Sequence, residues 1–278
     1  MEISRKTSID LAVKYCKKFG FMSKSFFWNH LTKGTESTKY RYWMLFLKSQ
    51  YFKPYRDIEE STDFFYINPS KLHLLNDGIQ PVTRRNQFYF YHDDKIMLVI
   101  FNLEQMKFIR QFWTEQELKS NRSLALDLLG GDYSKLPDLV FDLNISSETF
   151  RVALEIETTR KSNDRYLRSC IGYSAFSKID LIIFGTSEKR TSVAIKNAIN
   201  KSHFISQSLR FGFFDLNDFE KNKLNTLLEV NSNEISIGQF FKNLIEIKTK
   251  KLILATNNAC EKNAKTFADN LDTQKESA

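Results

Sequence analysis

Acidic residues at the ends of two neighbouring strands are the feature of this sequence best suited to chemistry. Asp138 follows a proline and opens an expected strand over residues 139–143. Glu155 and Glu157 close the next expected strand, which begins near residue 150. Because side chains alternate along a strand, Glu155 and Glu157 point to the same face. A hairpin that returns the second strand beside the first brings Asp138 to that pair.

Three carboxylates on one patch repel one another unless a proton or a cation neutralises them. Hard oxygen ligands of this kind favour Mg²⁺ or Mn²⁺. Such an ion polarises a phosphodiester and lowers the pKa of a bound water molecule. We therefore interpret Asp138, Glu155 and Glu157 as catalytic residues and metal ligands. Lys161, with Arg160 beside it, is the candidate for neutralising charge on the scissile phosphate.

The same residues also have simpler interpretations. A Pro-Asp pair at the start of a strand is common turn chemistry, and a Glu-x-Glu edge is often a solvated face. Asp142 alternates with Asp138, which is consistent with the acidic patch or with a row of residues facing solvent. Other chemistries lack support, because the four histidines show no ligand spacing and no phosphate-binding glycine loop or Gly-x-Ser-x-Gly motif is present.

The elements that position these residues follow an α/β pattern from residue 136 onward. Expected helices alternate with short strands, which is typical of a mixed sheet with helical cover. After the two strands that carry the acidic residues, we expect a helix over 162–176, a buried strand over 180–184, a helix over 188–202 and a last strand over 211–216. Upstream, residues 96–103 are an apolar stretch that predicts either a helix or a buried strand.

The first part of the chain has the order of a winged helix-turn-helix. Thr7 to Asp10 matches a capping box, and a first helix would end at Gly20. Ser23 would cap a second helix. A third helix from about Ser37 would bury one stripe, made of Tyr40, Trp43, Met44 and Leu47. Two strands, over 51–56 and 64–67, would form a wing around an acidic turn.

Positive charge gathers in this first part. Residues 1–56 hold 12 Lys and Arg against 3 acidic residues, a local net charge of +9, while the whole chain carries +8. A concentrated cationic domain attracts polyanions, and DNA is the default partner. The residues expected to contact double-stranded DNA are Lys39, Arg41, Tyr42, Lys48, Lys53 and Arg56. The alternative for this segment is a small helical domain used for dimerisation.

We therefore expect an α+β protein in which a winged helix-turn-helix precedes an α/β domain. Its expected parts are a winged-helix domain over 1–70, a linker and connecting helical region over 71–112, the α/β domain over 113–255 and a disordered tail over 256–278. Three widely spaced cysteines without a CxxC pair are typical of reduced thiols in the cytoplasm. No signal peptide or membrane partner is expected, because no apolar run is long enough.

The segment from about 115 to 216 resembles the PD-(D/E)XK nuclease superfamily. The resemblance is carried by Pro137-Asp138, by Glu155-Ile156-Glu157 after a turn, and by the helix and buried strand that follow. It implies a restriction-endonuclease-like fold. The chain departs from the motif at Glu157, where the superfamily usually has lysine. Some restriction enzymes of the superfamily use this variant, and Lys161 is either a relocated lysine or a solvated surface residue.

Read together, both halves resemble the replication-relaxation family, which includes the MobC-type mobilisation relaxases. The motifs are the winged helix, His92-Asp93-Asp94, Trp113-Thr114-Glu115, the two acidic motifs and Tyr173. The resemblance implies a metal-dependent endonuclease that nicks one strand at a plasmid origin of transfer. It also implies other relaxosome proteins and a conjugative coupling protein as partners. The alternatives are a non-enzymatic winged-helix regulator or relaxosome accessory protein, and a protein–protein adaptor.

Overall fold

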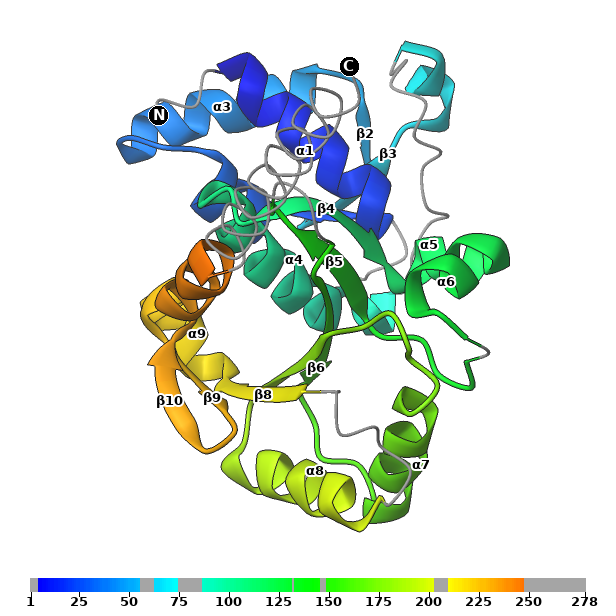
Figure 1. The fold of residues 1–278 in the computed structure, drawn as a ribbon. Helices are drawn as coiled ribbons and strands as arrows, with labels where there is room; N and C mark the ends of the chain where they lie inside the picture. The colour runs from blue at the N-terminus through cyan, green and yellow to red at the C-terminus, as the bar shows by residue number, and fades with distance from the viewer. Residues whose placement is uncertain are drawn as a thin grey trace, which may run out of the picture.

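The structure is a computed structural model of the 278-residue chain. It describes residues 5–55, 63–74, 87–131, 133–145, 149–202 and 210–247. Within these residues the fold is α+β, with a seven-stranded mixed sheet, a smaller three-stranded sheet and helices around both (Figure 1). None of the described helices is both long enough and apolar enough to cross a membrane.

The N-terminal segment is built from three helical stretches and three short strands. In chain order these are α1 (Arg5–Phe19), β1 (Met22–Ser23), α2 (Lys24–Phe26), a π-helical turn (Phe27–Leu31), α3 (Glu36–Lys48), β2 (Phe52–Pro54) and β3 (Phe64–Ile67). The strands form an antiparallel sheet in the order β1-β3-β2. The turn between β2 and β3, expected to be acidic, falls mostly outside the described residues.

Local chemistry explains where most of these helices begin and end. Gly20 adopts φ +79°, and its N–H donates to the carbonyl of Cys16, which closes α1 as predicted. The Ser23 hydroxyl accepts from the N–H of Phe26 and caps α2, also as predicted. The predicted capping box at Thr7 is wrong, because α1 already includes Arg5. Ser8 lies inside the helix, and its buried hydroxyl donates to the carbonyl of Leu31.

The third helix is rotated relative to the predicted stripe. Trp43 and Phe46 are the buried residues of α3, whereas Tyr40 and Leu47, expected inside, are 56% and 44% exposed. The ring of Phe46 stacks on Phe52 of β2 with centroids 4.1 Å apart. That aromatic contact turns the helix by about one residue from the predicted phase.

The rest of the described chain forms the large sheet and the helices that cover it. In chain order these strands and helices are α4 (Phe90–Gln105), β4 (Ile109–Thr114), α5 (Glu115–Ser120), α6 (Arg122–Leu129), β5 (Leu139–Leu143), β6 (Arg151–Glu157), α7 (Asn163–Tyr173), β7 (Leu181–Thr186), α8 (Lys189–Lys201), β8 (Arg210–Asp215), α9 (Leu216–Asn222), β9 (Leu227–Val230), β10 (Asn233–Ser236) and a last helix over 237–247. Short 3-10 turns cover Pro69–Leu74, Gln87–Tyr89 and Lys223–Asn225.

The type of strand pairing changes twice across this sheet, from antiparallel to parallel and back. The spatial order is β10-β9-β8-β7-β6-β5-β4. Strands β4, β5 and β6 pair antiparallel, and β6, β7 and β8 pair parallel. Helices α7 and α8 make the two crossovers between the parallel strands. Strand β8, predicted to be the last, is followed by β9 and β10, which extend the sheet antiparallel.

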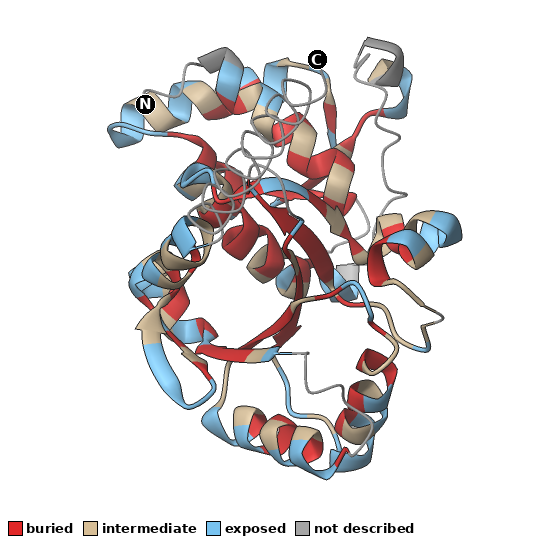
Figure 2. Ribbon diagram, viewed as in Figure 1, coloured by how far each residue is buried: buried red, intermediate tan, exposed pale blue. Residues whose placement is uncertain are grey.

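Two hydrophobic cores hold the sheet, one on each face (Figures 1 and 2). Helices α5 to α8 cover one face over a core that includes Val140 and Ala153. On the other face α4, α9 and the N-terminal segment share a single core with Leu139 and Leu154. The N-terminal segment therefore packs directly against the large sheet. For example, the ring of Tyr15 in α1 stacks on that of Phe112 in β4.

The region predicted to be a linker and connecting helices, 71–112, contains α4 and most of β4. The apolar stretch over 96–103 is helical and lies in α4, where it packs against the sheet. Strand β4 opens the large sheet before the predicted boundary at residue 113. The predicted disordered tail, 256–278, lies outside the described residues.

Candidate functional site

The pairing of β5 with β6 brings Asp138 to Glu155. Leu139 lies opposite Leu154, and the same register continued by one residue places Asp138 opposite Glu155. One oxygen of the Asp138 carboxylate, Oδ2, accepts a hydrogen bond of 2.7 Å from the N–H of Ile156. Since Leu154 and Ile156 belong to the core beneath α4, Glu155 and Glu157 point to the opposite face, as strand alternation predicts.

Asp142 does not belong to this group, although it lies on the same face of β5. Its carboxylate accepts two hydrogen bonds from Arg151, from Nε at 2.7 Å and from Nη2 at 3.1 Å. The remaining guanidinium nitrogen of Arg151 donates to the carbonyl of Leu128. Four residues of extended strand separate Asp142 from Asp138, about 13 Å. Asp142 therefore serves a structural ion pair at the far end of the strand.

A lysine ammonium lies against Glu155. Nζ of Lys135, which precedes β5, is 2.6 Å from Glu155 Oε2 and donates to the Tyr173 hydroxyl at 2.6 Å. The Glu155 side chain is 2% exposed, while that of Lys135 is 25% exposed, so the pair is open to solvent at the lysine end. Burial alone would lower the pKa of Lys135, but the charges of Glu155 and then Asp138 outweigh it and raise that pKa.

Burial also shapes the chemistry of Glu155. It raises the pKa of the Glu155 carboxyl to about 7, with the Asp138 charge adding to the rise and the Lys135 ammonium opposing it. Burial raises the pKa of Tyr173 well above its ordinary value, and the nearby Glu155 charge raises it further. Tyr173 therefore stays a neutral phenol that orients Lys135.

His92 approaches Asp138 from the first turn of α4. Its Nε2 lies 2.9 Å from the Ile156 carbonyl and 3.4 Å from Asp138 Oδ2, and its Nδ1 lies 3.0 Å from Asp93. Burial lowers the pKa of His92, but the hydrogen bonds to Asp138 and Asp93 outweigh it and raise that pKa to about 11. The ring is thus an imidazolium, and its bond and charge keep the pKa of Asp138 below the ordinary value despite burial.

Glu157 and Lys161 form a pair of their own. Nζ of Lys161 is 2.6 Å from Glu157 Oε1, and the Glu157 side chain is 5% exposed. The backbone N–H of Lys161 donates to the Tyr166 hydroxyl at 2.9 Å, which holds the turn after β6. Lys161 therefore neutralises Glu157. The lysine that pairs with Glu155 and interacts electrostatically with Asp138 is Lys135.

The oxygen atoms at this site fit a hard divalent cation in part. Glu155 Oε1 is buried and has no hydrogen-bond partner, and it belongs to a carboxylate facing a second one on Asp138. Mg²⁺ and Mn²⁺ prefer such donors. No group of three or more His, Cys, Asp and Glu side chains among the described residues is arranged to hold a metal ion. The assignment of Asp138, Glu155 and Glu157 as metal ligands stays a prediction.

The residues predicted to contact DNA are spread over α3 and β2. Arg41, Lys48 and Lys53 are exposed. Lys39 is half-buried and forms an ion pair of 3.4 Å with Glu36. Tyr42, expected to face outward for DNA contact, is half-buried and packs against the core. The cause is the same rotation of α3 that exposes Tyr40. Arg56, the sixth predicted contact, lies outside the described residues.

Two of the residues that complete the site were missed or undervalued by sequence reasoning. Lys135 stands in an irregular segment before β5, where no periodic pattern marks it. Its position three residues before Asp138 was the available signal. His92 appeared only within a motif of the resemblance, because a lone histidine at a helix start has no ligand spacing.

Neither protein-family models nor curated proteins nor solved structures give a match to this chain.

Proposed function

We propose that this protein is a metal-dependent DNA endonuclease that nicks one strand, with Asp138 and Glu155 holding Mg²⁺ or Mn²⁺. The observation that carries the proposal is the meeting of Asp138, Glu155 and Lys135 at one end of β5 and β6. Two acidic side chains and a lysine that meet at the ends of two adjacent strands are the donor set of a phosphodiester-cleaving site. The chain order of these strands, α7 and β7 agrees with the resemblance to PD-(D/E)XK nucleases.

The bound ion would polarise the phosphate and lower the pKa of a bound water molecule. The chain's own residues have distinct roles around it. His92 keeps Asp138 ionised and fixes it against the backbone of β6. Lys135, held by Tyr173, supplies positive charge for the phosphate or the leaving oxygen. Lys161, predicted to neutralise the scissile phosphate, is paired with Glu157 and would act through it. Glu157 would then hold Lys161 in place rather than bind the metal ion.

The N-terminal segment is the proposed means of finding DNA. Its order of helices and strands, with the sheet order β1-β3-β2, supports a winged helix-turn-helix. The exposed cations Arg41, Lys48 and Lys53 lie on its third helix and second strand. From the resemblance, we extend the proposal to nicking at a plasmid origin of transfer, together with relaxosome proteins, in the cytoplasm.

One observation favours a second candidate function. The Lys135 ammonium already compensates Glu155 without a metal ion. A protein in which this pairing is permanent would bind DNA without cutting it, as a winged-helix regulator or relaxosome accessory protein.

Plasmid nicking separates the two functions. Wild type, Asp138→Asn, Glu155→Gln and the control Lys221→Ala would be incubated with Mg²⁺ or Mn²⁺ and a supercoiled plasmid library that carries genomic fragments of the source organism. Lys221 is an exposed cation on α9. We expect open-circle product from wild type and the control, and at least about 100-fold less from the two site variants, which corresponds to about 2.7 kcal/mol of transition-state stabilisation.

Circular dichroism would establish that both site variants fold. Asn at position 138 retains an oxygen for the Ile156 N–H, so the fold should tolerate it. Absence of product from folded wild type that still binds duplex DNA would overturn the endonuclease and support the regulator.

A further inference from the structure

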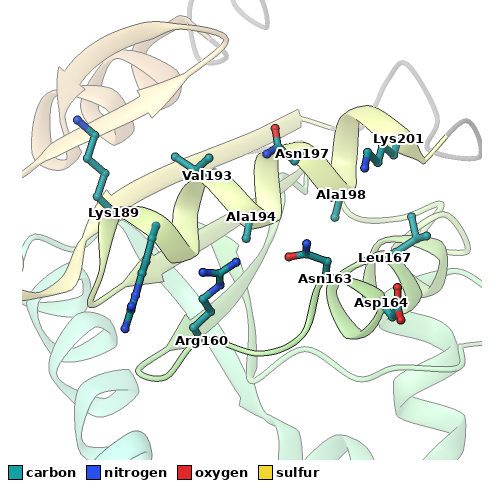
Figure 3. A pocket seen from close by; sticks show the side chains of 11 residues that line it. Arg160, Asn163, Asp164, Leu167, Lys189, Val193, Ala194, Asn197, Ala198 and Lys201 are labelled. Atoms are coloured by element: carbon teal, nitrogen blue, oxygen red, sulfur yellow. The ribbon is translucent and has the colours of Figure 1, made fainter.

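A groove runs between α7 and α8, on the sheet face that also carries Glu155 and Glu157 (Figure 3). Its cavity volume is about 620 Å³. The first part of α7, the length of α8 and the turn after β6 form its walls. Duplex DNA is too wide to enter a cavity of this size, which matches the volume of small-ligand sites. A few nucleotides of a single strand would fit.

The rim of the groove is cationic. Arg160, Lys189, Arg190 and Lys201 line it, against one acidic residue, Asp164. Arg190 forms an ion pair with Glu188. The other three cations form no ion pair with any residue in the described part of the chain. The hydrogen bond from Arg190 lowers the pKa of the Glu188 carboxyl, and the charge of Arg160 also acts on Glu188 and helps to lower that pKa. A groove in which cations outnumber carboxylates attracts an anionic chain, because each phosphate bound releases counterions.

The floor between these cations is apolar. Ala194 and Ala198 of α8 point toward α7, whose Leu167 also lines the groove, whereas Val193, which is 48% exposed, lines it from the other side of α8 (Figure 3). Sugars and bases of an unpaired strand cover such a surface. The amides of Asn163 and Asn197 also line the groove and can bond base edges. Single-strand sites combine a cationic groove along the backbone with side chains that contact the bases, most often aromatic ones; here the side chains available for the bases are aliphatic and amide groups.

The groove is connected to the carboxylate site through short pieces of chain. Arg160 follows Glu157 by three residues, in the turn between β6 and α7. Helix α7 lines the groove at its N-terminal part, and its last residue, Tyr173, accepts the hydrogen bond from Lys135. Among the cations of the groove, Arg160 is the nearest in the chain to the carboxylate residues.

We propose that the α7–α8 groove binds an unpaired segment of DNA next to the carboxylate site. The proposal rests on the proposed function for the identity of the polyanion, and it does not require cleavage. Bound metal is not needed either, since the cations of the groove belong to the chain. The protein would therefore hold single-stranded DNA in the presence of EDTA.

Binding of fluorescein-labelled dT12 in EDTA, followed by anisotropy at several salt concentrations, tests the groove. The variant Arg160→Ala/Lys189→Ala removes two cations of the groove, and Lys221→Ala, on α9, is the control from outside the groove. We expect the double variant to bind about tenfold more weakly at 0.1 M salt. The slope of log K against log salt should fall by about 1.4, about 0.7 for each lost phosphate contact. The control should match wild type.

A label on a residue that lines the groove locates the bound strand. Cys16 and Cys170 are buried, so Val193→Cys in a Cys260→Ser background gives one reactive site for an environment-sensitive dye. dT12 should change its fluorescence at the concentration that raises the anisotropy. A response to dTMP at the same concentration as to dT12 would instead make the groove a free-nucleotide site and overturn the proposal.

The outcomes for the groove and for the endonuclease are separable. If Arg160→Ala/Lys189→Ala leaves the dT12 affinity and the salt slope unchanged, the proposal that the groove binds single-stranded DNA is wrong, even if plasmid nicking is observed. Intact groove binding with no nicking under any metal overturns only the endonuclease.

Discussion

Removing the ammonium from the buried pair is the most informative single perturbation. Lys135→Met keeps the length of the side chain and leaves the Glu155 carboxyl, 2% exposed, without its partner. Breaking a buried ion pair from one side costs about 3–5 kcal/mol of stability when the remaining group stays charged. Because the lysine end is 25% exposed, water can enter there, and the lower end, about 3 kcal/mol, applies.

The loss should depend on pH, with a sign that follows from the carboxyl. The pKa of Glu155 in the folded protein is about 7, raised from an ordinary 4.5. A carboxyl whose pKa is higher in the folded than in the unfolded chain contributes its full stability below pH 4.5. This contribution is lost as the pH rises through the folded-state pKa. Lys135→Met raises that pKa further, so the variant goes on losing stability above pH 7, where wild type has stopped.

Below pH 6 Glu155 is protonated in both proteins, and the variant loses only a hydrogen bond and packing, about 1 kcal/mol. The destabilisation should therefore grow by about 2 kcal/mol between pH 6 and pH 9, because the Glu155 carboxyl ionises at a higher pH in the folded variant than in folded wild type. Urea denaturation in EDTA, followed by circular dichroism, measures it. Lys135→Met/Glu155→Gln should be more stable than Lys135→Met at pH 9.

Equal destabilisation by Lys135→Met at pH 6 and pH 9 would refute this reasoning. So would a double variant as unstable as the single one at pH 9, because the cost would then not come from the unpaired carboxylate.

Three further changes have expected outcomes in the same denaturation assay. Burial raises the pKa of Asp94 to about 6 from 3.8, so between pH 4 and pH 6, where this carboxyl ionises first in the unfolded chain, wild type should lose up to about 3 kcal/mol from Asp94, in addition to the loss from Glu155. Asp94→Asn should reduce the slope by the Asp94 share and leave the Glu155 share; a slope equal to that of wild type would contradict it. Arg151→Met strands the buried Asp142 carboxylate and should cost about 3 kcal/mol at pH 7, whereas a cost below 1 kcal/mol would show that the pair is solvated. Gly130→Ala should cost about 2 kcal/mol, since Gly130 adopts φ +83° and an added Cβ would lie 2.8 Å from the backbone nitrogen of Lys178; wild-type stability would show that the turn relaxes.

Sequence reasoning was most reliable where a short period or a local cap decides the structure. Alternation placed Glu155 and Glu157 on one face of β6, and the turn before it returned β6 beside β5. Gly20 and Ser23 marked helix ends because their geometry or hydroxyl acts within a few residues.

It was least reliable where distant packing decides. The phase of α3 depends on Phe46 stacking against Phe52, which periodicity within the helix does not contain. Strands β9 and β10 are short and only partly buried, so their patterns are weak. Lys135 acquires its role only when Glu155 and Tyr173 are folded around it.

Calorimetric titration of the metal-free protein with Mn²⁺ tests the central claim most directly. If Asp138 and Glu155 hold the ion, wild type binds one Mn²⁺ per chain, and Asp138→Asn and Glu155→Gln bind it at least about tenfold more weakly, a difference of about 1.4 kcal/mol. Lys135→Met, which removes the competing ammonium, binds it more tightly than wild type. Binding that is absent in wild type, or equal in wild type and both carboxylate variants, would contradict the account.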